Sequence, residues 1–366
     1  MMSLLLILSC AVFRTDAAPE AALSLSARSA VLIDADSGNI LYSKNHTEIM
    51  EMASTTKIMT ALVAAESSDL KRTVKVTPEA VGVEGSSIYL HEGERITMEE
   101  LLYSLLLQSA NDAATAIAIA VAGSVEAFAD MMNERACEMG LEDTHFTNPH
   151  GLNDEEHYTT AYELAIITAH ALSNDTVREI VSTYKKAIPI DSDCNPRILV
   201  NHNKMLRLYD GAIGVKTGFT KRAGRCLVSA AERDGLTLIA VTLNAPDDWQ
   251  DHTKMLDFGF ESYESLLVAE VGAFSYALPV TGGQEEFVTL TNTEELRFTV
   301  PRDRDKIECQ VETFHRFEFA PVHRGADAGK VYCFYNGEVV DSSVLICAEN
   351  INRINDDSSF LNGIFK

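Results

Sequence analysis

The sequence predicts an α+β protein, with an antiparallel sheet flanked by helices and a helical subdomain, followed by a small all-β domain. Two observations support this prediction. Short β-prone runs stand before and after a long helical middle, an order typical of α+β domains. Beyond Phe258-Gly259-Phe260 the helical periodicity is lost and short β-rich runs follow. We therefore expect a first domain over residues 25–265, a β domain over 270–348 and a tail over 349–366.

The first domain opens with a hairpin and a helix. Residues 30–33 and 40–42 are β-prone, and turn-forming residues lie between them, which predicts a hairpin. From Ser54 to about Ala65 apolar residues recur at helical spacing, so Ser54 stands where a helix begins.

The remaining elements follow from caps and periodicity. Thr97-Met98-Glu99-Glu100 is a capping box in front of an apolar helix face. Further helices are expected at 112–122, at 125–139 and beyond Thr159, and strands at 211–218, 225–231 and 237–243. The β-rich runs of the second domain are 287–290, 296–300, 331–334 and 344–346.

Size and charge limit what the chain can do. Its 366 residues are enough for two domains, and 46% of them are hydrophobic. With 30 basic and 54 acidic residues the formal net charge is −24. Such a chain repels phosphate backbones and anionic lipid headgroups alike, so we expect no nucleic-acid partner.

The N-terminus predicts export. Residues 1–18 resemble a signal peptide, because an apolar run from Leu4 to Phe13 precedes the small residues Ala17 and Ala18. A positively charged start is missing, so a mis-assigned start is the alternative. No run of about 18 apolar residues occurs elsewhere, and a membrane-spanning helix is not expected. The predicted location is the cell envelope, at the outer face of the cytoplasmic membrane or secreted.

The cysteines are widely scattered. They form no C-x-x-C pair and no cluster with histidine, so neither a metal site nor a cofactor is expected. An exported chain could pair some of them, but the sequence leaves the pairing open. The seven cysteines are Cys10, Cys137, Cys194, Cys226, Cys309, Cys333 and Cys347.

Three short motifs together supply what an acyl-transfer enzyme needs. Ser54-Thr55-Thr56-Lys57 is S-x-x-K, a spacing that puts a hydroxyl and an amine on one helical face. Lysine is normally protonated at neutral pH, so Lys57 can act as a base only if burial and a nearby cation lower its pKa. Lys216 could be that cation.

The other two motifs border the same predicted cleft. In Lys216-Thr217-Gly218, Thr217 can hydrogen-bond a substrate carboxylate, and Gly218 lets the backbone approach closely. Ser109 and Asn111 form S-x-N at a junction between helices. Ser109 could relay a proton to the leaving amine, and Asn111 could bind the substrate amide.

Each motif alone is weak evidence. S-x-x-K occurs again at residues 68–71 and 182–185, and S-x-N at 37–39 and 43–45. K-T-G occurs once, and the three motifs come in the order S-x-x-K, S-x-N, K-T-G on a helix start, a helix junction and a strand. This combination is the one known from penicillin-binding proteins and class A β-lactamases.

The sequence that flanks the motifs resembles that of the low-molecular-mass penicillin-binding D-alanyl-D-alanine carboxypeptidases, serine peptidases of the S11 type. The resemblance spans residues 28–265 and includes Asn148-Pro149-His150-Gly151-Leu152. It implies a penicillin-binding-protein fold and removal of the terminal D-alanine from peptidoglycan stem peptides ending in D-Ala-D-Ala. It also implies that β-lactams are covalent inhibitors, and that Ser54 is the nucleophile and Lys57 its base. The backbone N–H groups of Ser54 and Phe219 would form the oxyanion hole.

The sequence departs from the family in two respects. Some relatives hold the terminal carboxylate with an arginine downstream of K-T-G, and residues 245–251 offer none. Carboxylate binding would then rest on Thr217 and Lys216, with Arg222 or Arg225 as helpers. Members often end in a membrane-bound amphipathic helix, but residues 349–366 have no wide apolar face and no basic cluster, so peripheral membrane contact has weak support.

Three rival interpretations remain. A class A β-lactamase needs a glutamate in an E-x-x-L-N loop, and the nearest candidate, Glu163 with the four residues after it, does not fit. A catalytically silent envelope protein that binds peptidoglycan or β-lactams is disfavoured by the intact motif residues. His150 beside Gly151 suggests a triad histidine, but Lys57 already provides a base and we expect a turn or packing role.

Overall fold

The computed structural model describes residues 23–190, 193–304 and 307–354. The chain divides into two compact units, Met1–Glu261 and Ser262–Lys366, while the sequence placed the boundary near residue 265. The predicted signal peptide and most of the predicted tail lie outside the described residues.

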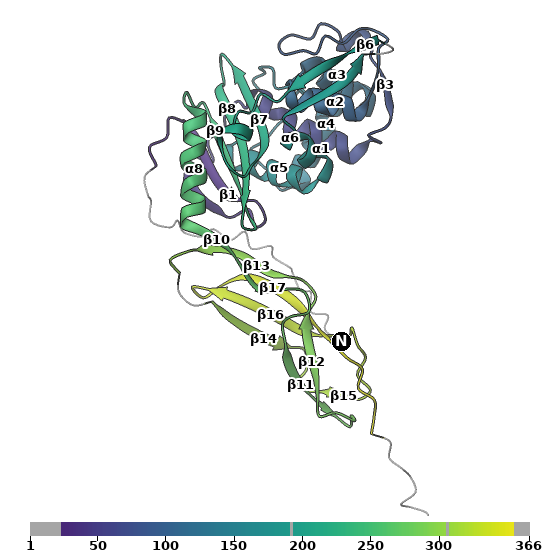
Figure 1. The fold of residues 1–366 in the computed structure, drawn as a ribbon, viewed down its shortest axis with the longest axis vertical. Helices are drawn as coiled ribbons and strands as arrows, with labels where there is room; N and C mark the ends of the chain where they lie inside the picture. The colour runs from purple at the N-terminus through teal and green to yellow at the C-terminus, as the bar shows by residue number, and fades with distance from the viewer. Residues whose placement is uncertain (1–22, 191–192, 305–306, 355–366) are drawn as a thin grey trace, which may run out of the picture. The chain divides into compact units, whose positions relative to one another are not determined.

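The first unit contains a five-stranded antiparallel sheet in the order β2-β1-β9-β8-β7. Figure 1 shows α8 (Asp248–Ser262) on one side of this sheet and α5 (Ala161–Ser173) on the other. A Cβ at Gly259 of α8 would lie 2.4 Å from the Leu238 side chain, so glycine lets this helix pack closely. Because both faces are covered, the inner strand β1 is buried throughout. The strands are β1 (Ser29–Asp34), β2 (Ile40–Lys44), β7 (Ala212–Thr220), β8 (Gly224–Arg233) and β9 (Leu236–Leu243).

The helical part surrounds α1 (Lys57–Ser67), which contacts α2, α3, α4, α5 and α6. Eight successive residues of α1, from Lys57 to Ala64, are buried, because neighbours cover it on all sides. The predicted capping box is confirmed: Thr97 and Glu100 bond each other's backbone N–H at the start of α2. The other helices are α2 (Met98–Leu107), α3 (Asn111–Ala122), α4 (Val125–Glu138) and α6 (Asp175–Ser182).

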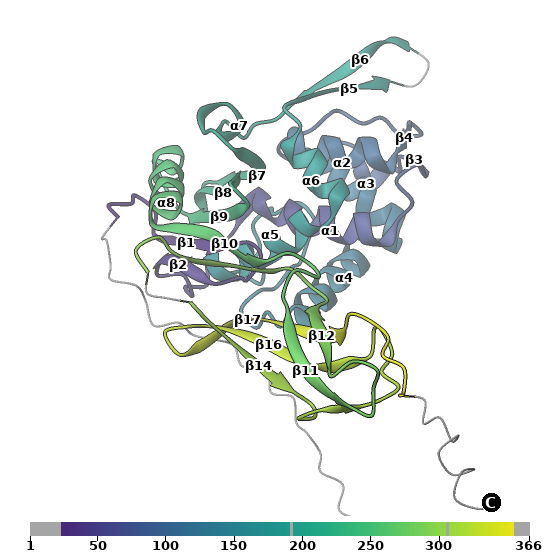
Figure 2. The same ribbon diagram turned by 60° about the horizontal axis from the view of Figure 1, so that its bottom comes forward.

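Several smaller elements complete this unit. Figure 2 shows the hairpin of β5 (Lys185–Ile190) and β6 (Asp193–Val200) extending outward from the helices. The sequence did not predict this hairpin, nor α6 or α8. Short pieces are β3 (Thr73–Lys75), β4 (Arg95–Thr97), α7 (Met205–Leu208) and the 3-10 helices η1 (Ala53–Thr56) and η2 (Pro78–Ala80).

The second unit is all β, as predicted. Alternate residues of β13 are buried, which is the pattern of a strand with one face on a core. The four predicted runs fall in β12, β13, β16 and β17. The unit pairs β10 (Tyr263–Ala269) with β13 (Leu296–Pro301) and has a sheet in the order β14-β16-β17-β12-β11-β15. The strands of that sheet are β11 (Tyr276–Thr281), β12 (Phe287–Asn292), β14 (Glu308–Thr313), β15 (Glu318–Phe319), β16 (Asp327–Tyr335) and β17 (Glu338–Cys347).

The β unit is longer than the expected 270–348. It begins with β10, and residues placed in the tail belong to it, because Ile351 bridges Val322 and Arg353 bridges Gly283 through the backbone. Among the described residues no single helix is long and apolar enough to cross a membrane, and only the bent pair α3 and α4 passes on length and composition together.

Candidate active site

Ser54 lies in the short turn η1, directly before α1. The turn packs closely against two backbone segments, one at Gly151 and one at Gly218. Ala53 has a left-handed φ of 47°, and a Cβ at Gly151 would lie only 1.9 Å from the Ala53 carbonyl oxygen. On the other side, a Cβ at Gly218 would lie 3.1 Å from the Ser54 nitrogen. Glycine at 151 and 218 thus allows the close approach that fixes the turn, while Ser54 itself is only half-buried.

Lys57 is fully buried and its Nζ has three acceptors around it. It donates to Ser54 Oγ at 3.0 Å, to Asn111 Oδ1 at 2.7 Å and to the His150 carbonyl at 2.6 Å. An ammonium has three N–H groups, so the set is complete. In the neutral amine one N–H becomes a lone pair. The two carbonyl oxygens can only accept, so that lone pair must face the Ser54 hydroxyl.

The pKa of Lys57 is held well below its usual value. Burial is the main cause, the nearby Lys216 lowers it further, and Asp112 acts in the opposite direction. Burial also lowers the pKa of Lys216 to about 7. Both predicted causes therefore operate on Lys57, which makes a neutral base accessible near neutral pH.

The K-T-G segment lies on β7, which contacts η1. Lys216 is buried and donates to the Thr217 carbonyl at 2.8 Å. Thr217 is half-buried, and the Phe219 side chain is 66% exposed. The structure therefore brings Gly218 against the Ser54 turn, as the sequence order implied. The roles of Thr217 and of the Phe219 N–H toward a substrate stay predictions.

Ser109 and Asn111 lie at the junction of α2 and α3. Ser109 has a left-handed φ of 59°, and both residues are buried. The Asn111 amide is held from two sides, since its oxygen accepts from Lys57 and its nitrogen donates to the Glu84 carbonyl at 2.5 Å. In this arrangement Asn111 orients the base. The predicted contact of Asn111 with a substrate amide and the proton relay by Ser109 stay predictions.

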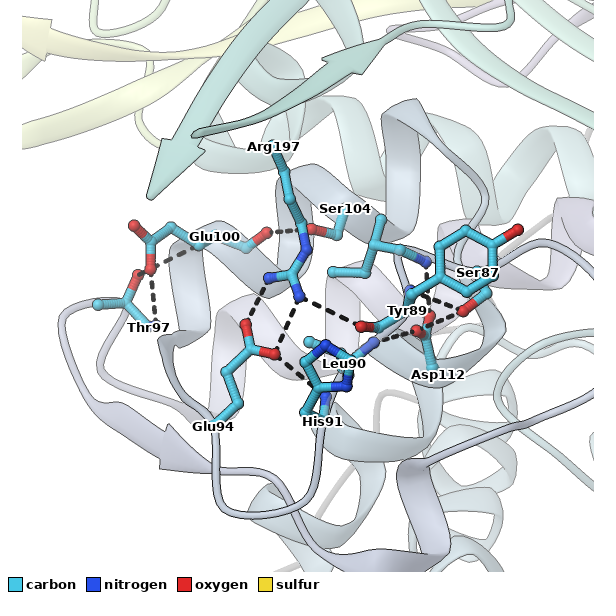
Figure 3. A network of polar contacts seen from close by, with 11 residues as sticks. Ser87, Tyr89, Leu90, His91, Glu94, Thr97, Glu100, Ser104, Asp112 and Arg197 are labelled. Atoms are coloured by element: carbon cyan, nitrogen blue, oxygen red, sulfur yellow. Dashed lines mark hydrogen bonds and ion pairs between the residues drawn. The ribbon is translucent and has the colours of Figure 1, made fainter. Parts of the chain in front are cut away.

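Asp112, the second residue of α3, belongs to a polar network that Figure 3 shows. The Asp112 carboxylate accepts from Ser87 Oγ at 2.6 Å and from the Leu90 N–H at 3.0 Å. Arg197 of β6 forms a buried ion pair with Glu94, in which Nη2 donates to Oε2 at 2.9 Å. The segment from Glu84 to Glu94 is thus tied at one end to α3 and at the other to the β5–β6 hairpin.

His150 contributes through its backbone. Its carbonyl accepts from Lys57, while its ring Nδ1 accepts the Leu152 N–H at 3.3 Å. Burial and the neighbouring Lys57 lower the pKa of the ring to about 3, so the imidazole is neutral at physiological pH. A group with so low a pKa is a weak proton acceptor near neutral pH, so the ring is not the base that Ser54 needs. The segment contributes one carbonyl and one close-packed glycine instead.

Comparisons with known proteins identify the family. Residues 15–247 match the peptidase S11 family, described as D-alanyl-D-alanine carboxypeptidase. The chain is 34% identical over 340 residues to the D-alanyl-D-alanine carboxypeptidase DacF of Bacillus subtilis, covering 90% of this chain and 87% of that protein.

The chain belongs to the peptidase S11 family.

Solved structures extend the likeness over both units. Penicillin binding protein 5 from Haemophilus influenzae superposes with a TM-score of 0.74 at 27% identity, covering 90% of this chain and 98% of that one. PBP3 from Streptococcus pneumoniae, described as a peptidoglycan synthesis regulatory factor, gives a TM-score of 0.77 at 25% identity, covering 90% and 100%. The predicted family and the predicted fold class are both confirmed.

Within this S11 enzyme the two arginines proposed as helpers already have carboxylate partners. Arg222 Nε lies 2.5 Å from Glu51 Oε1, and Arg225 Nη2 lies 2.8 Å from Asp248 Oδ1. Either arginine would have to leave its partner to hold a substrate carboxylate.

The rival lactamase interpretation finds no support at Glu163. Its carboxylate accepts the backbone N–H groups of Glu142 at 2.9 Å and Asp143 at 3.0 Å, so it serves to hold a loop. The other S-x-x-K matches also differ from the first. Residue 68 follows the end of α1, and residues 182–185 run from the end of α6 into β5, so neither places its serine and lysine on one helix.

Proposed function

We propose that this S11 carboxypeptidase removes the terminal D-alanine of peptidoglycan stem peptides through an acyl-enzyme on Ser54. The observation that carries the proposal is the environment of Lys57 Nζ, which lies 3.0 Å from Ser54 Oγ and has carbonyl oxygens as its other two acceptors. A neutral Lys57 takes the Ser54 proton while Oγ attacks the carbonyl of the penultimate D-alanine.

The remaining steps use the surrounding groups. The backbone N–H groups of Ser54 and Phe219 stabilise the oxyanion, an interaction worth about 3 kcal/mol per donor. As the C–N bond breaks, the leaving D-alanine amine takes up a proton through Ser109. Water then attacks the ester, with Lys57 accepting its proton, and Ser54 is released. Lys216 and Thr217 hold the terminal carboxylate of the substrate.

β-Lactams would enter the same site and acylate Ser54. The carbonyl of the strained ring stands in for the D-Ala-D-Ala carbonyl, and the opened ring stays attached to Ser54. A slow-hydrolysing adduct separates the carboxypeptidase from a lactamase, for which fast turnover of penicillin is the expected result.

We also propose that the enzyme works outside the cytoplasmic membrane. Its substrate is part of the cell wall, and the N-terminal residues resemble an export signal. Fractionation of the native host tests this proposal, since an unprocessed chain confined to the cytoplasm would contradict it.

The catalytic proposal is tested by release of D-alanine from diacetyl-Lys-D-Ala-D-Ala. Wild type should release it, and Ser54→Ala should lower the rate at least about 1000-fold. Ser68→Ala is the matched control, because it removes the serine of another S-x-x-K match and should keep wild-type activity. Absence of release by correctly folded wild type, or an active Ser54→Ala variant, would overturn the proposal.

A further inference from the structure

The second unit contains a pair of cysteines that the proposed reaction does not use. Cys309 of β14 and Cys333 of β16 are directly opposite each other in the antiparallel register. Opposed residues of this kind project to the same face, with Cα atoms about 4.5 to 5.5 Å apart, and a disulfide spans about 4.4 to 6.8 Å. The two sulfur atoms are 2.9 Å apart as free thiols.

We propose that Cys309 and Cys333 are oxidised to a disulfide that ties β14 to β16. Closing the bond requires the sulfurs to approach from 2.9 Å to about 2.05 Å, a shift that side-chain rotation supplies without moving the strands. β14 is the outer strand of its sheet, so the bond would fasten an edge that otherwise relies on backbone pairing with one neighbour.

Other described cysteines lack such a partner in their strand pairs. Cys226 is opposite Gly218 in the first unit, and Cys347 is opposite Leu290. Cys137 lies on α4 and is exposed. Among the residues that the structure describes, the strand pairing therefore sets only Cys309 and Cys333 against each other.

The two thiols have different roles in the oxidation. Cys309 is exposed, whereas Cys333 is buried in the core of the unit. The Cys309 thiolate attacks a small-molecule or protein disulfide, forming a mixed disulfide and releasing one thiol. Cys333 loses its proton to solvent and attacks Cys309 Sγ, which releases the second thiol. Two electrons pass from the cysteines to the oxidant, which leaves as two thiols.

Burial and the adjacent Cys309 thiol raise the pKa of Cys333, which agrees with Cys309 reacting first. An oxidising compartment preserves such a bond and a reducing cytosol does not. The inference goes beyond the carboxypeptidase proposal and is independent of it, because it involves the second unit alone.

The test uses the full chain, purified reduced and then incubated with oxidised glutathione. After alkylation of free thiols and tryptic digestion without reductant, residues 307–316 and 331–353 should be recovered joined, two hydrogens lighter than the separate peptides. We expect this link to exceed any other cysteine pair at least about tenfold, and this selectivity to disappear in urea. Recovery of both peptides alkylated, or of glutathione retained on Cys309, would overturn the proposal.

Two variants assign the bond, because the peptide 331–353 also contains Cys347. Cys347→Ser should keep the link, and Cys333→Ser should lose it. A link that disappears in Cys347→Ser and persists in Cys333→Ser would contradict the assignment. The wild-type digest needs no variant, so a folding defect in either one leaves the main test intact.

Discussion

Lys57 and Lys216 are the two buried lysines of the site, and they have different roles. Lys57 must give up its proton near neutral pH, and Lys216 contributes to that by placing a second positive charge nearby. Lys216 itself has a pKa of about 7, because it is buried. Its effect on Lys57 is therefore strongest below pH 7, where Lys216 is charged.

Replacing Lys216 with methionine should shift the pH dependence of acylation. Removal of a like charge raises the pKa of Lys57, so the rising limb of the rate of acylation by benzylpenicillin should move to higher pH. Stopped-flow acylation between pH 5 and 9 measures this limb. A limb that stays in place would show that the charge of Lys216 does not lower the pKa of Lys57.

Gly151 gives a second prediction at the same scale. Its φ of +83° is left-handed, and an added Cβ would clash with the Ala53 carbonyl. Gly123 has a similar φ of +87° but open space around it, so Gly123→Ala is a matched control that pays only the backbone cost, about 1–2 kcal/mol. Gly151→Ala should lose at least about 2 kcal/mol more.

Urea titrations monitored by tryptophan fluorescence measure the free energy of unfolding of both variants. Acylation by benzylpenicillin should slow in Gly151→Ala alone. Equal losses of stability in the two variants would show that the backbone around Ala53 moves to make room for the added Cβ.

At the scale of elements, the β5–β6 hairpin supports the segment from Glu84 to Glu94, whose Glu84 carbonyl holds the Asn111 amide. An ion pair between Arg197 of the hairpin and Glu94 of the segment joins the two, and the side chains of these residues are 10% and 2% exposed. Burial alone would raise the pKa of Glu94, but hydrogen bonds from Arg197 and from the His91 N–H more than offset it, so this pKa is lowered. Such a pair is costly to break from one side.

Arg197→Met should therefore lower the free energy of unfolding by about 3 kcal/mol. In wild type the lowered pKa of Glu94 gives stability that is present at neutral pH and lost as pH falls. Without Arg197, burial raises this pKa, so the variant should lose stability as pH rises from about 4 to 7. Urea titrations across this range measure the trend.

The double variant Arg197→Met with Glu94→Gln should recover most of the loss, because no charge then stays buried. Acylation of Ser54 should slow in the single variant and recover in the double one. A single variant that unfolds like wild type at every pH would show that the pair does not support this segment.

The sequence predicted what local patterns determine. The capping box at Thr97, the strand carrying Lys216 and the helix start at Ser54 all depend on neighbours within a few residues. The carbonyls of His150 and Glu84 were not predicted, because a backbone oxygen has no signature in the sequence. Arg197 reaches Glu94 across 103 positions, and nothing local to either residue indicates it.

At the scale of the whole molecule, the same distinction explains the missed elements. The helix α8 begins at Asp248, and its buried face includes the polar residues Asp248, Asp251 and His252, so the sequence shows no continuous apolar stripe there. The runs in β12 and β16 were apolar enough to predict, whereas the edge strand β14 is mostly exposed and polar.

The two units should respond separately to reduction, because the proposed disulfide lies in the second unit and the single tryptophan, Trp249, lies in the first. Joining Cys309 to Cys333 closes a loop between residues 24 apart, which stabilises a fold by about 3 kcal/mol. Dithiothreitol should therefore lower the urea concentration at which half of the second unit is unfolded. Pulse proteolysis measures this midpoint. It should leave the Trp249 fluorescence transition and benzylpenicillin acylation unchanged. Cys309→Ser should show the lower midpoint with or without dithiothreitol. A second unit insensitive to dithiothreitol, or a Trp249 transition that moves with it, would contradict a stabilising bond confined to that unit.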